Sequence, residues 1–230
     1  MTDQPRSKIN WDTFHEYRDY CAREDCFLLC TGPSLLQFDI DFFVGPYFTV
    51  GVNEAVFHYP NLNFLFVQDT KPTHEHGYAN KRDVYNHAEY PKLEAKFAGK
   101  APYIPSIRTI PWEDINKHGW LPYEIGREGL CEFEADIDTY CLGDGNSVAF
   151  SAAQWALFTG ITTLYLVGVD ITPRNTILDE PPGDFHPYLH WDHLGKWKAF
   201  KLWSKTHYPK TNIVSVNPVG LKGLFEEIEI

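Results

Sequence analysis

Short apolar runs alternate along the chain with polar or glycine-containing breaks. The runs occupy residues 26–31, 47–52 and 63–67 in the first part, and 163–169 and 213–216 in the last part. A continuous apolar run of this length between turn formers predicts a strand that is buried on both faces. Most runs stop at a polar residue or a glycine, as expected where a parallel sheet presents its functional side chains.

Two longer segments have helical character. Residues 146–160 begin with Asn146 or Ser147 as the cap and end at Gly160, which predicts a well-delimited buried helix. A second helix is predicted from about His190 to His207. Its regularly spaced apolar residues are Trp191, Leu194, Trp197 and Phe200. Strands that alternate with helices predict an α/β fold, a Rossmann-like and mostly parallel sheet with helices on both faces.

The middle of the chain is less regular. Between residues 71 and 145 tyrosines, histidines, prolines and charges follow no firm period, apart from a short candidate strand at residues 103–107. Such stretches are typical of lids or peripheral insertions at a sheet edge. With 230 residues the chain has the length of one substantial core. We therefore predict a single domain over residues 1–230 that carries an irregular middle insertion at 71–145.

The net charge and the apolar content of the chain limit the kinds of molecule that the protein is expected to bind. The net charge of -11 argues against general binding to nucleic acid, which needs a basic surface. An anionic small molecule is still allowed, because one local pocket can oppose the overall sign. No apolar run approaches the roughly 18 residues that span a membrane, and the first residues lack the apolar core of a signal peptide. A cytoplasmic protein is expected, and the composition is compatible with a homo-oligomer.

The five cysteines form no Cys-x-x-Cys motif. Cys26 and Cys30 share a face of the predicted first strand but lie too far apart along it to form a disulfide. They are expected to be small buried apolar residues in a reducing compartment. The cysteines therefore predict no structural zinc site.

The break after the first strand is the most informative local signal. Residues 31–34 read Thr-Gly-Pro-Ser, in which Gly32 allows a tight turn, Pro33 suits a first helical turn and Ser34 can cap N–H groups. A strand that runs into a helix N-terminus makes an anion site at the carboxyl edge of a parallel sheet. The alternative is a tight strand-to-helix turn without a ligand.

Other polar residues end the neighbouring runs and are expected at the same edge. They are Asn53, Gln68, Asp69, Asn146, Ser147 and Asp170. Small polar groups together with free helix-terminal amides suit the base, ribose and phosphates of a nucleotide. Asp170 has three interpretations: a helix cap, the partner of a buried donor, or a functional carboxylate. With Asp69 it could also hold Mg²⁺, which proteins bind through one or two carboxylates plus ligand phosphates.

Residues 184–193 are the richest segment in titratable groups. His186 and His190 lie four residues apart, but Pro187 between them argues against one continuous helical face that binds a metal. A histidine near the start of a helix suits a general base or a phosphate contact. The alternative is a histidine packed structurally among Tyr188 and Trp191.

Taken together, these motifs resemble a known group of proteins. The resemblance is to the 6-hydroxymethylpterin diphosphokinase-like (MptE-like) proteins. It rests on four motifs: the Gly-Pro-Ser-Leu turn, the strand that ends in Asn53, the Gly-Asn-Ser-Val helix start at 145–148, and the run 164–170. The same skeleton is similar to the bacterial sialyltransferases of glycosyltransferase family 42. The resemblance covers most of residues 26–220 and omits much of the insertion.

The sialyltransferase resemblance implies specific roles. The turn and the asparagine after the second strand would contact the CMP part of the donor, which assigns this role to Gly32, Pro33, Ser34 and Asn53. Thr31 stands where the family carries asparagine, and Gln68 is the polar residue that ends the third strand. His190, with His186 as its neighbour, corresponds to the catalytic base that deprotonates the acceptor hydroxyl. Arg174 is a candidate phosphate ligand in place of the family's tyrosines.

Three functional hypotheses follow. The first is a glycosyltransferase whose nucleotide-sugar donor is an acidic sugar linked to CMP. This enzyme would need no cofactor and would act on a small-molecule or glycan acceptor. The second is a diphosphokinase-like enzyme that needs Mg²⁺ at Asp69 and Asp170. The third is a non-catalytic nucleotide-binding protein of the same fold.

Overall fold

The computed structural model describes residues 15, 17–39, 41–43, 45, 47–53, 55–59, 62–67, 103–105, 133, 137, 142, 143, 147–171 and 187–230, and for residues 57, 67, 103–105 and 187–192 the backbone alone. Its strands are β1 (Asp25–Leu29), β2 (Phe48–Val52), β3 (Phe64–Val67), β4 (Tyr103–Pro105), β5 (Thr163–Val167), β6 (Asn212–Val216) and β7 (Glu226–Ile228). Its helices are the 3-10 helix η2 (Pro33–Gln37) and the α-helices α2 (Ala55–His58), α5 (Val148–Phe158) and α6 (Pro187–His207).

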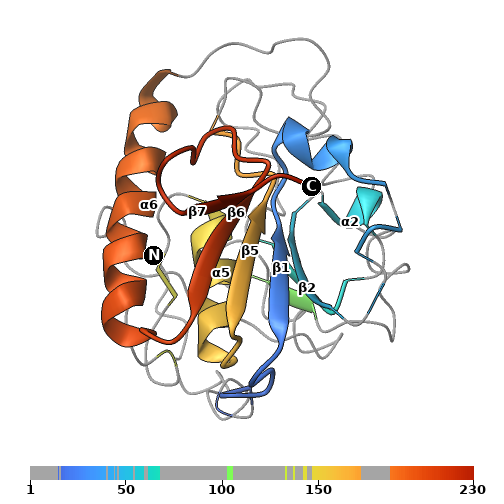
Figure 1. Ribbon diagram of the computed structural model, residues 1–230, viewed down its shortest axis with the longest axis vertical. Coiled ribbons are helices and arrows are strands. Elements are labelled where there is room, and N and C mark those ends of the chain that lie inside the picture. The colour runs from blue at the N-terminus through green and yellow to red at the C-terminus, as the bar shows by residue number, and fades with distance from the viewer. Residues whose placement is uncertain are drawn as a thin grey trace, which may run out of the picture.

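The described strands form one seven-stranded sheet in the order β4-β3-β2-β1-β5-β6-β7. All six neighbouring pairs are parallel, which confirms the predicted parallel sheet. Figure 1 shows β7, β6, β5, β1 and β2 side by side with α6 along the β7 side. The order reverses between β1 and β5, so the chain leaves the centre of the sheet in both directions, as in doubly wound folds.

The sequence pattern predicted residues 213–216 as the last strand, and the structure adds β7 beyond it. The β7 sequence is Glu-Glu-Ile, and its two glutamates are exposed. A short strand at the edge of a sheet has one side in water, so it needs no apolar run. This is the physical reason why periodicity did not detect it.

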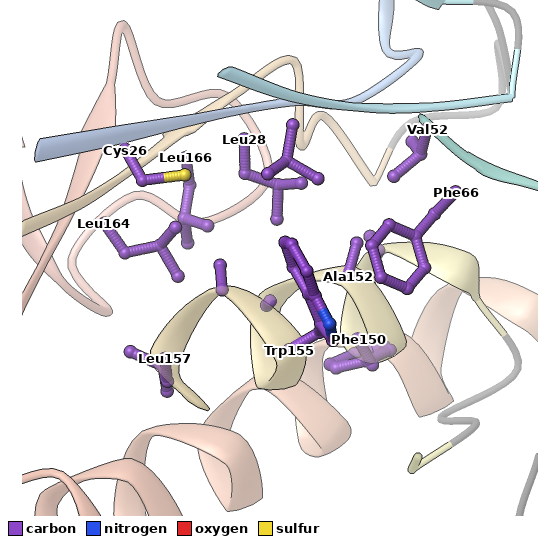
Figure 2. Packing of buried hydrophobic residues seen from close by; sticks show 14 of the residues in the cluster. Cys26, Leu28, Val52, Phe66, Phe150, Ala152, Trp155, Leu157, Leu164 and Leu166 are labelled. Carbon is purple, nitrogen blue, oxygen red and sulfur yellow. The ribbon is translucent and has the colours of Figure 1, made fainter. Parts of the chain in front are cut away.

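One face of the sheet is covered by α5 and α6, and Trp155 fills the centre of this layer. Figure 2 shows Trp155 extending from α5 toward Leu28, Val52 and Phe66 on the strands. Its ring centroid lies 4.5 Å from that of Phe64 and 5.5 Å from that of Phe66. Offset and tilted aromatic contacts of this kind add to the free energy gained from apolar burial.

Helix α5 is buried along its whole length. All eleven of its residues are buried, including the polar Ser151 and Gln154. Both polar side chains bond to the backbone of Gly143: the Ser151 hydroxyl donates to its carbonyl at 2.9 Å, and the Gln154 side-chain oxygen accepts from its N–H at 2.6 Å. Buried polar groups are tolerated because they are paired in this way.

The opposite face is covered by the short helices η2 and α2. Leu35 of η2, Phe38 directly after it, and Ala55 and Val56 of α2 join Leu29 and Val167 of the sheet in a second apolar cluster. The Tyr59 hydroxyl, directly after α2, ties the two helices together, because its single hydrogen is shared between the carbonyls of Phe38 at 2.7 Å and Leu35 at 3.0 Å. Helices therefore lie on both faces, as predicted.

Most of the predicted insertion at residues 71–145 lies outside the described residues, apart from β4 and positions 133, 137, 142 and 143. The single-domain division stays a prediction. Within the described part of the chain, no helix combines the length and the apolar composition required to cross a membrane.

The packing predicts a large effect of truncating Trp155. Trp155→Ala should lower the free energy of unfolding by about 3–5 kcal/mol, because it removes a fully buried ring and leaves a cavity. Leu202→Ala is the matched control, since this side chain is 71% exposed on α6 and its loss should cost less than about 0.5 kcal/mol. Urea denaturation measures both, and equal effects would contradict the described core.

The buried thiols predict a loss of stability in alkali. Burial raises the pKa of Cys21 to about 12 from 9.0, so the native state keeps a proton that the unfolded chain loses above about pH 9. The free energy of unfolding should therefore fall as pH rises from 9 toward 12. Between pH 8 and 10, wild type should lose about 1 kcal/mol more than Cys21→Ala in urea titrations. Parallel pH curves for the two proteins would refute this assignment.

Candidate functional site

The candidate site lies where the strand order reverses. The chain leaves β1 through residues 30–34 and leaves β5 through residues 168–171, and these two turns meet at the carboxyl ends of adjacent strands. Their contact is direct, because the Gly32 N–H donates to the Gly168 carbonyl at 2.8 Å. In open α/β sheets, ligands bind in the crevice outside such a reversal point.

Asp170 pairs with Ser34 across this reversal point. One carboxylate oxygen accepts the Ser34 backbone N–H at 2.7 Å, and the other accepts the Ser34 hydroxyl. Both residues are buried, with 5% and 6% of their surface exposed. Of the three interpretations that the sequence left open for Asp170, the geometry matches the partner of a buried donor. The carboxylate also acts as a long-range cap for η2.

The backbone amides at the start of η2 all have partners within the protein or carry no hydrogen. Gly32 donates to Gly168, Pro33 has no N–H, Ser34 donates to Asp170, and Leu35 donates to the Gly32 carbonyl at 3.0 Å. The expectation of free helix-terminal amides at this turn is therefore wrong. The reason is that Asp170, which the sequence places 136 residues away, supplies the anion from inside the protein.

Three glycines let the loops after β1, β5 and β6 approach one another. A Cβ on Gly32 would lie 2.4 Å from the Gly168 carbonyl oxygen, and one on Gly220 would lie 2.2 Å from the Asp170 carbonyl oxygen. Gly168 has φ +72° and would place a Cβ 2.6 Å from the Cys30 carbonyl oxygen. The sequence analysis assigned no role to Gly168 or Gly220. For Gly168, its position within the apolar run 163–169 was the sequence feature that could have indicated a special role.

The Cys30 thiol lies beneath this turn and is not a nucleophile candidate. Burial raises its pKa well above the ordinary thiol value, and the Asp170 carboxylate nearby raises it further. A neutral, buried thiol is unreactive at physiological pH. Cys21, Cys26 and Cys30 are free and buried, which confirms the prediction made for Cys26 and Cys30.

Asn53 ends the next strand at the same edge. Its backbone N–H donates to the Phe66 carbonyl at 2.8 Å, which continues the pairing of β2 with β3. Its φ is +42°, a left-handed conformation that asparagine tolerates better than most residues. The side chain is half-buried. A polar residue therefore turns the chain directly after the strand, one strand away from the Ser34–Asp170 pair.

Ser147 begins α5 and caps it. Its φ is -154°, and its side-chain oxygen accepts from the Ala149 N–H at 3.4 Å. This confirms Ser147 as the cap, and Gly160 follows the helix with φ +81°, as its predicted end requires. Because α5 and α6 run antiparallel to the strands, their N-termini lie at the carboxyl edge of the sheet (Figure 1).

His190 lies in the first turn of α6, three residues after Pro187, which begins the helix. Figure 1 shows the N-terminal end of α6 at the end of the molecule where the strands terminate, and the first turn of this helix includes residue 190. Helix α6 starts earlier than residue 190 because proline suits the first helical position. The predicted site residues Gln68, Asp69, Asn146, Arg174 and His186 lie outside the described residues.

Among the described residues, no group of three or more histidines, cysteines or acidic side chains could hold a metal ion. The Mg²⁺ pair that the sequence suggested has one member, Asp69, outside this part of the chain. The other, Asp170, already accepts a hydrogen bond at each carboxylate oxygen.

Neither a protein-family model nor a curated protein matches the sequence. Among solved structures, the backbone is similar to the sialyltransferase CstII from Campylobacter jejuni in complex with cytidine-5'-monophosphate. The identity is 12%, the match covers 90% of this chain and 85% of that one, and the TM-score is 0.47.

A structure of the sialyltransferase CST-II with trisaccharide acceptor and CMP gives 14% identity, coverage of 87% and 83%, and a TM-score of 0.46. At these values the likeness supports no inference about activity.

The interlocked turns predict opposite effects for two glycine substitutions. Gly168→Ala should lower the free energy of unfolding by more than about 2 kcal/mol, because its φ is positive and a Cβ would meet the Cys30 carbonyl. Gly195→Ala should raise it by about 0.5–1 kcal/mol, since this α6 glycine has no neighbour within 4 Å. Chemical denaturation of both variants tests the pair. A tolerated Gly168→Ala would argue against the described turn.

Proposed function

We propose that the protein is a sialyltransferase-like glycosyltransferase that transfers an acidic sugar from a CMP-type donor to an acceptor hydroxyl. The observation that carries the proposal is the strand-order reversal point, where the turn 31–34 meets Asp170. Asn53 ends the neighbouring strand, and the α6 turn with His190 lies at the same end of the molecule. Apart from Thr31 and Arg174, the proposed residues resemble the family 42 motifs in order and spacing.

The nucleotide would be held by polar groups from several strand ends. Thr31 and Pro33 are half-buried at the turn, and Asn53 and Ser147 are half-buried at the ends of β2 and the start of α5. Because the described members of this set come from different elements, the fold would set their mutual positions before the ligand arrives, which lowers the entropic cost of binding. Gln68, Asn146 and Arg174 complete the proposed set.

The transfer step needs one base and a stabilised leaving group. The His190 imidazole would take the proton of the acceptor hydroxyl, and the resulting oxygen would attack the anomeric carbon of the donor sugar. The bond from that carbon to the phosphate oxygen breaks, and CMP leaves with the electron pair. His186 would assist as the neighbour of the base. The N-terminal dipole of α5 would favour the negative charge of the departing phosphate.

Asp170 has a positioning role in this proposal. Its carboxylate is occupied by Ser34, and it holds the turn after β1 against the end of β5. The same engagement disfavours the diphosphokinase alternative, in which Asp170 would have to coordinate Mg²⁺ with Asp69. The proposed transferase needs no metal.

The proposed base predicts a selective loss of turnover. His190→Ala should lower the rate of sugar transfer from a CMP-linked acidic sugar by about 10²–10⁴-fold and leave the Kd for CMP unchanged. His207→Ala, at the exposed end of the same helix, is the matched control and should keep full activity. The rate of transfer is measured from the release of CMP, and the Kd for CMP is measured by calorimetry. Full activity in His190→Ala would remove His190 as the base.

The choice of nucleotide predicts a metal-independent shift in Tm. CMP should raise the Tm without added metal, because a ligand that binds only the native state stabilises it by mass action. Cytidine, CDP and ATP, each with and without Mg²⁺, provide the comparison. An ATP response that requires Mg²⁺ would favour the diphosphokinase-like alternative, and no response to any nucleotide would contradict both enzymes.

A further inference from the structure

One face of the sheet is partly open to solvent near the amino ends of its strands. Leu29, Val167 and Val216, the last residues of β1, β5 and β6, belong to the apolar cluster under η2 and α2. Side chains alternate along a strand, so the residues two and four positions earlier lie on this same face. Central strands of a parallel sheet are normally buried on both sides. On β5, however, Thr163 and Tyr165 are only half-buried, so this face of the strand is in contact with water.

The strand register aligns the side chains of this open region. Two rows cross the sheet here, one that is mainly aromatic and apolar and one at the amino ends that is polar. The first row is Phe27, Tyr165, Val214 and Glu226, and the second row is Asp25, Thr163 and Asn212. Asn212 and Glu226 are exposed, and Asp25 is half-buried. Polar groups from four adjacent strands therefore share this face with the Tyr165 ring.

Two tyrosine rings on this face are held by Phe27. The Tyr165 ring stacks on Phe27 with a centroid distance of 4.7 Å and an interplanar angle of 17°. Phe27 therefore covers one face of the Tyr165 ring, and the exposed part of this ring belongs to its other side. Tyr47 meets Phe27 edge-on at 5.1 Å and is 44% exposed. Because these contacts fix the rings, a ligand that stacks on them has little side-chain freedom to remove.

The hydroxyl end of Tyr165 lies among charged and hydrogen-bonding groups. Burial raises the pKa of Tyr165, and the Asp25 and Glu226 carboxylates raise it further, whereas a hydrogen bond with the Thr163 side chain lowers it. Both carboxylates are therefore close enough to act on the same hydroxyl. The Asp25 carboxylate also accepts the Thr162 hydroxyl at 3.0 Å, which fixes its position. This end of the ring thus offers acceptors in a defined arrangement.

We propose that this surface binds the neutral pyranose units of a glycan. The Tyr165 surface, as we name it, consists of Asp25, Tyr47, Thr163, Tyr165, Asn212 and Glu226. A pyranose ring carries C–H groups on its faces and hydroxyl groups around its edge. Its face can pack on a tyrosine ring. Its hydroxyls can donate to the carboxylates and exchange hydrogen bonds with the Thr163 hydroxyl and the Asn212 carboxamide.

The charge of the Tyr165 surface favours a neutral sugar over other occupants. Asp25 and Glu226 would repel an acidic sugar or a phosphate. In a two-fold dimer the same patch faces itself, so these carboxylates would meet their own copies in a protein whose net charge is already -11. A cation would match the carboxylates alone, whereas a sugar also uses the Thr163 hydroxyl and the Asn212 carboxamide.

The Tyr165 surface lies at the opposite end of the strands from the candidate transfer site. Asp25, Thr163 and Asn212 are the first residues of their strands, whereas Asp170 follows the carboxyl end of β5. Strands of this length span about 13 Å. The inference rests on the proposed function only in the identity of the glycan, which would be the acceptor. Sugar units held at this surface would raise the effective concentration of the reacting hydroxyl of the same glycan at the transfer site.

The first experiment follows backbone amides of the wild-type protein by NMR during titration with cellotriose. Cellotriose should shift the Thr163, Tyr165 and Val214 amides and leave those of Gly32 and Ser34 unchanged. The methyl glycosides of glucose and glucuronic acid form a matched pair, of which the acid should bind at least about threefold more weakly. Absence of any shift at up to about 50 mM cellotriose, or equal affinity for the two glycosides, would overturn the inference.

Spermidine and dilution test the other occupants in the same spectra. If spermidine shifts these amides more strongly than cellotriose does, the surface binds cations and the inference is wrong. If the amides shift with protein concentration in the absence of ligand, a second copy covers the surface and the inference is again wrong. Unchanged spectra in both cases support the glycan.

The second experiment tests the ring by substitution. Tyr165→Leu keeps an apolar side chain on Phe27 but removes the flat ring, so the Kd for cellotriose should rise about 3–10-fold. Tyr165→Phe keeps the ring and should change the Kd less than about twofold. Tyr20→Leu is the matched control, because Tyr20 is 62% exposed and contacts Tyr17 of the other apolar cluster. Equal Kd values for Tyr165→Leu and wild type would contradict the inference. If Tyr165→Leu does not fold, Tyr47→Leu, at a more exposed position, should raise the Kd and decides instead.

Binding and transfer separate this inference from the proposed function. With an acceptor of several sugar units, Tyr165→Leu should raise KM and leave kcat unchanged, and with a single-sugar acceptor it should change neither. If cellotriose binds but no sugar is transferred from a CMP-linked donor, the Tyr165 surface stands and the proposed function is wrong. If transfer occurs but cellotriose shifts no amide, the proposed function stands and the inference is wrong.

Discussion

The pairing of Ser34 with Asp170 is the interaction on which the arrangement of this sheet edge depends. It joins the turn after β1 to the turn after β5 across 136 residues of chain, at the place where the strand order reverses. A buried carboxylate is costly unless hydrogen bonds satisfy it, and two buried donors are costly without an acceptor. Each residue therefore requires the other, and the two turns are held in one geometry.

The surrounding structure is built to permit this pairing. Gly32, Gly168 and Gly220 let three loops approach within distances that any Cβ would prevent. Below them, the sheet is held by a dense aromatic layer around Trp155 on one face and by η2, α2 and Tyr59 on the other. The core thus supplies a rigid platform, and the loops at its carboxyl edge supply the variable chemistry, which is how α/β folds separate stability from function.

The proposed transferase chemistry fits an edge of this kind, because it depends on positioned hydrogen-bonding groups and on one general base. The Ser34 donors at the turn are engaged by Asp170. The N-termini of α5 and α6 lie at the same edge of the sheet, and their positive ends favour negative charge.

The sequence by itself predicted the parallel sheet, the helices on both faces, a cap at Asn146 or Ser147 and the helix end at Gly160. It also predicted that Ser34, Asn53 and Asp170 lie at one edge of the sheet. These features follow from apolar runs and turn residues, which are local signals. Only the tertiary structure decided that Asp170 satisfies Ser34, that the amides at the turn are engaged, and that β7 extends the sheet. The physical reason is distance along the chain: a hydrogen-bond partner 136 residues away and an edge strand without an apolar run leave no periodic trace in the sequence.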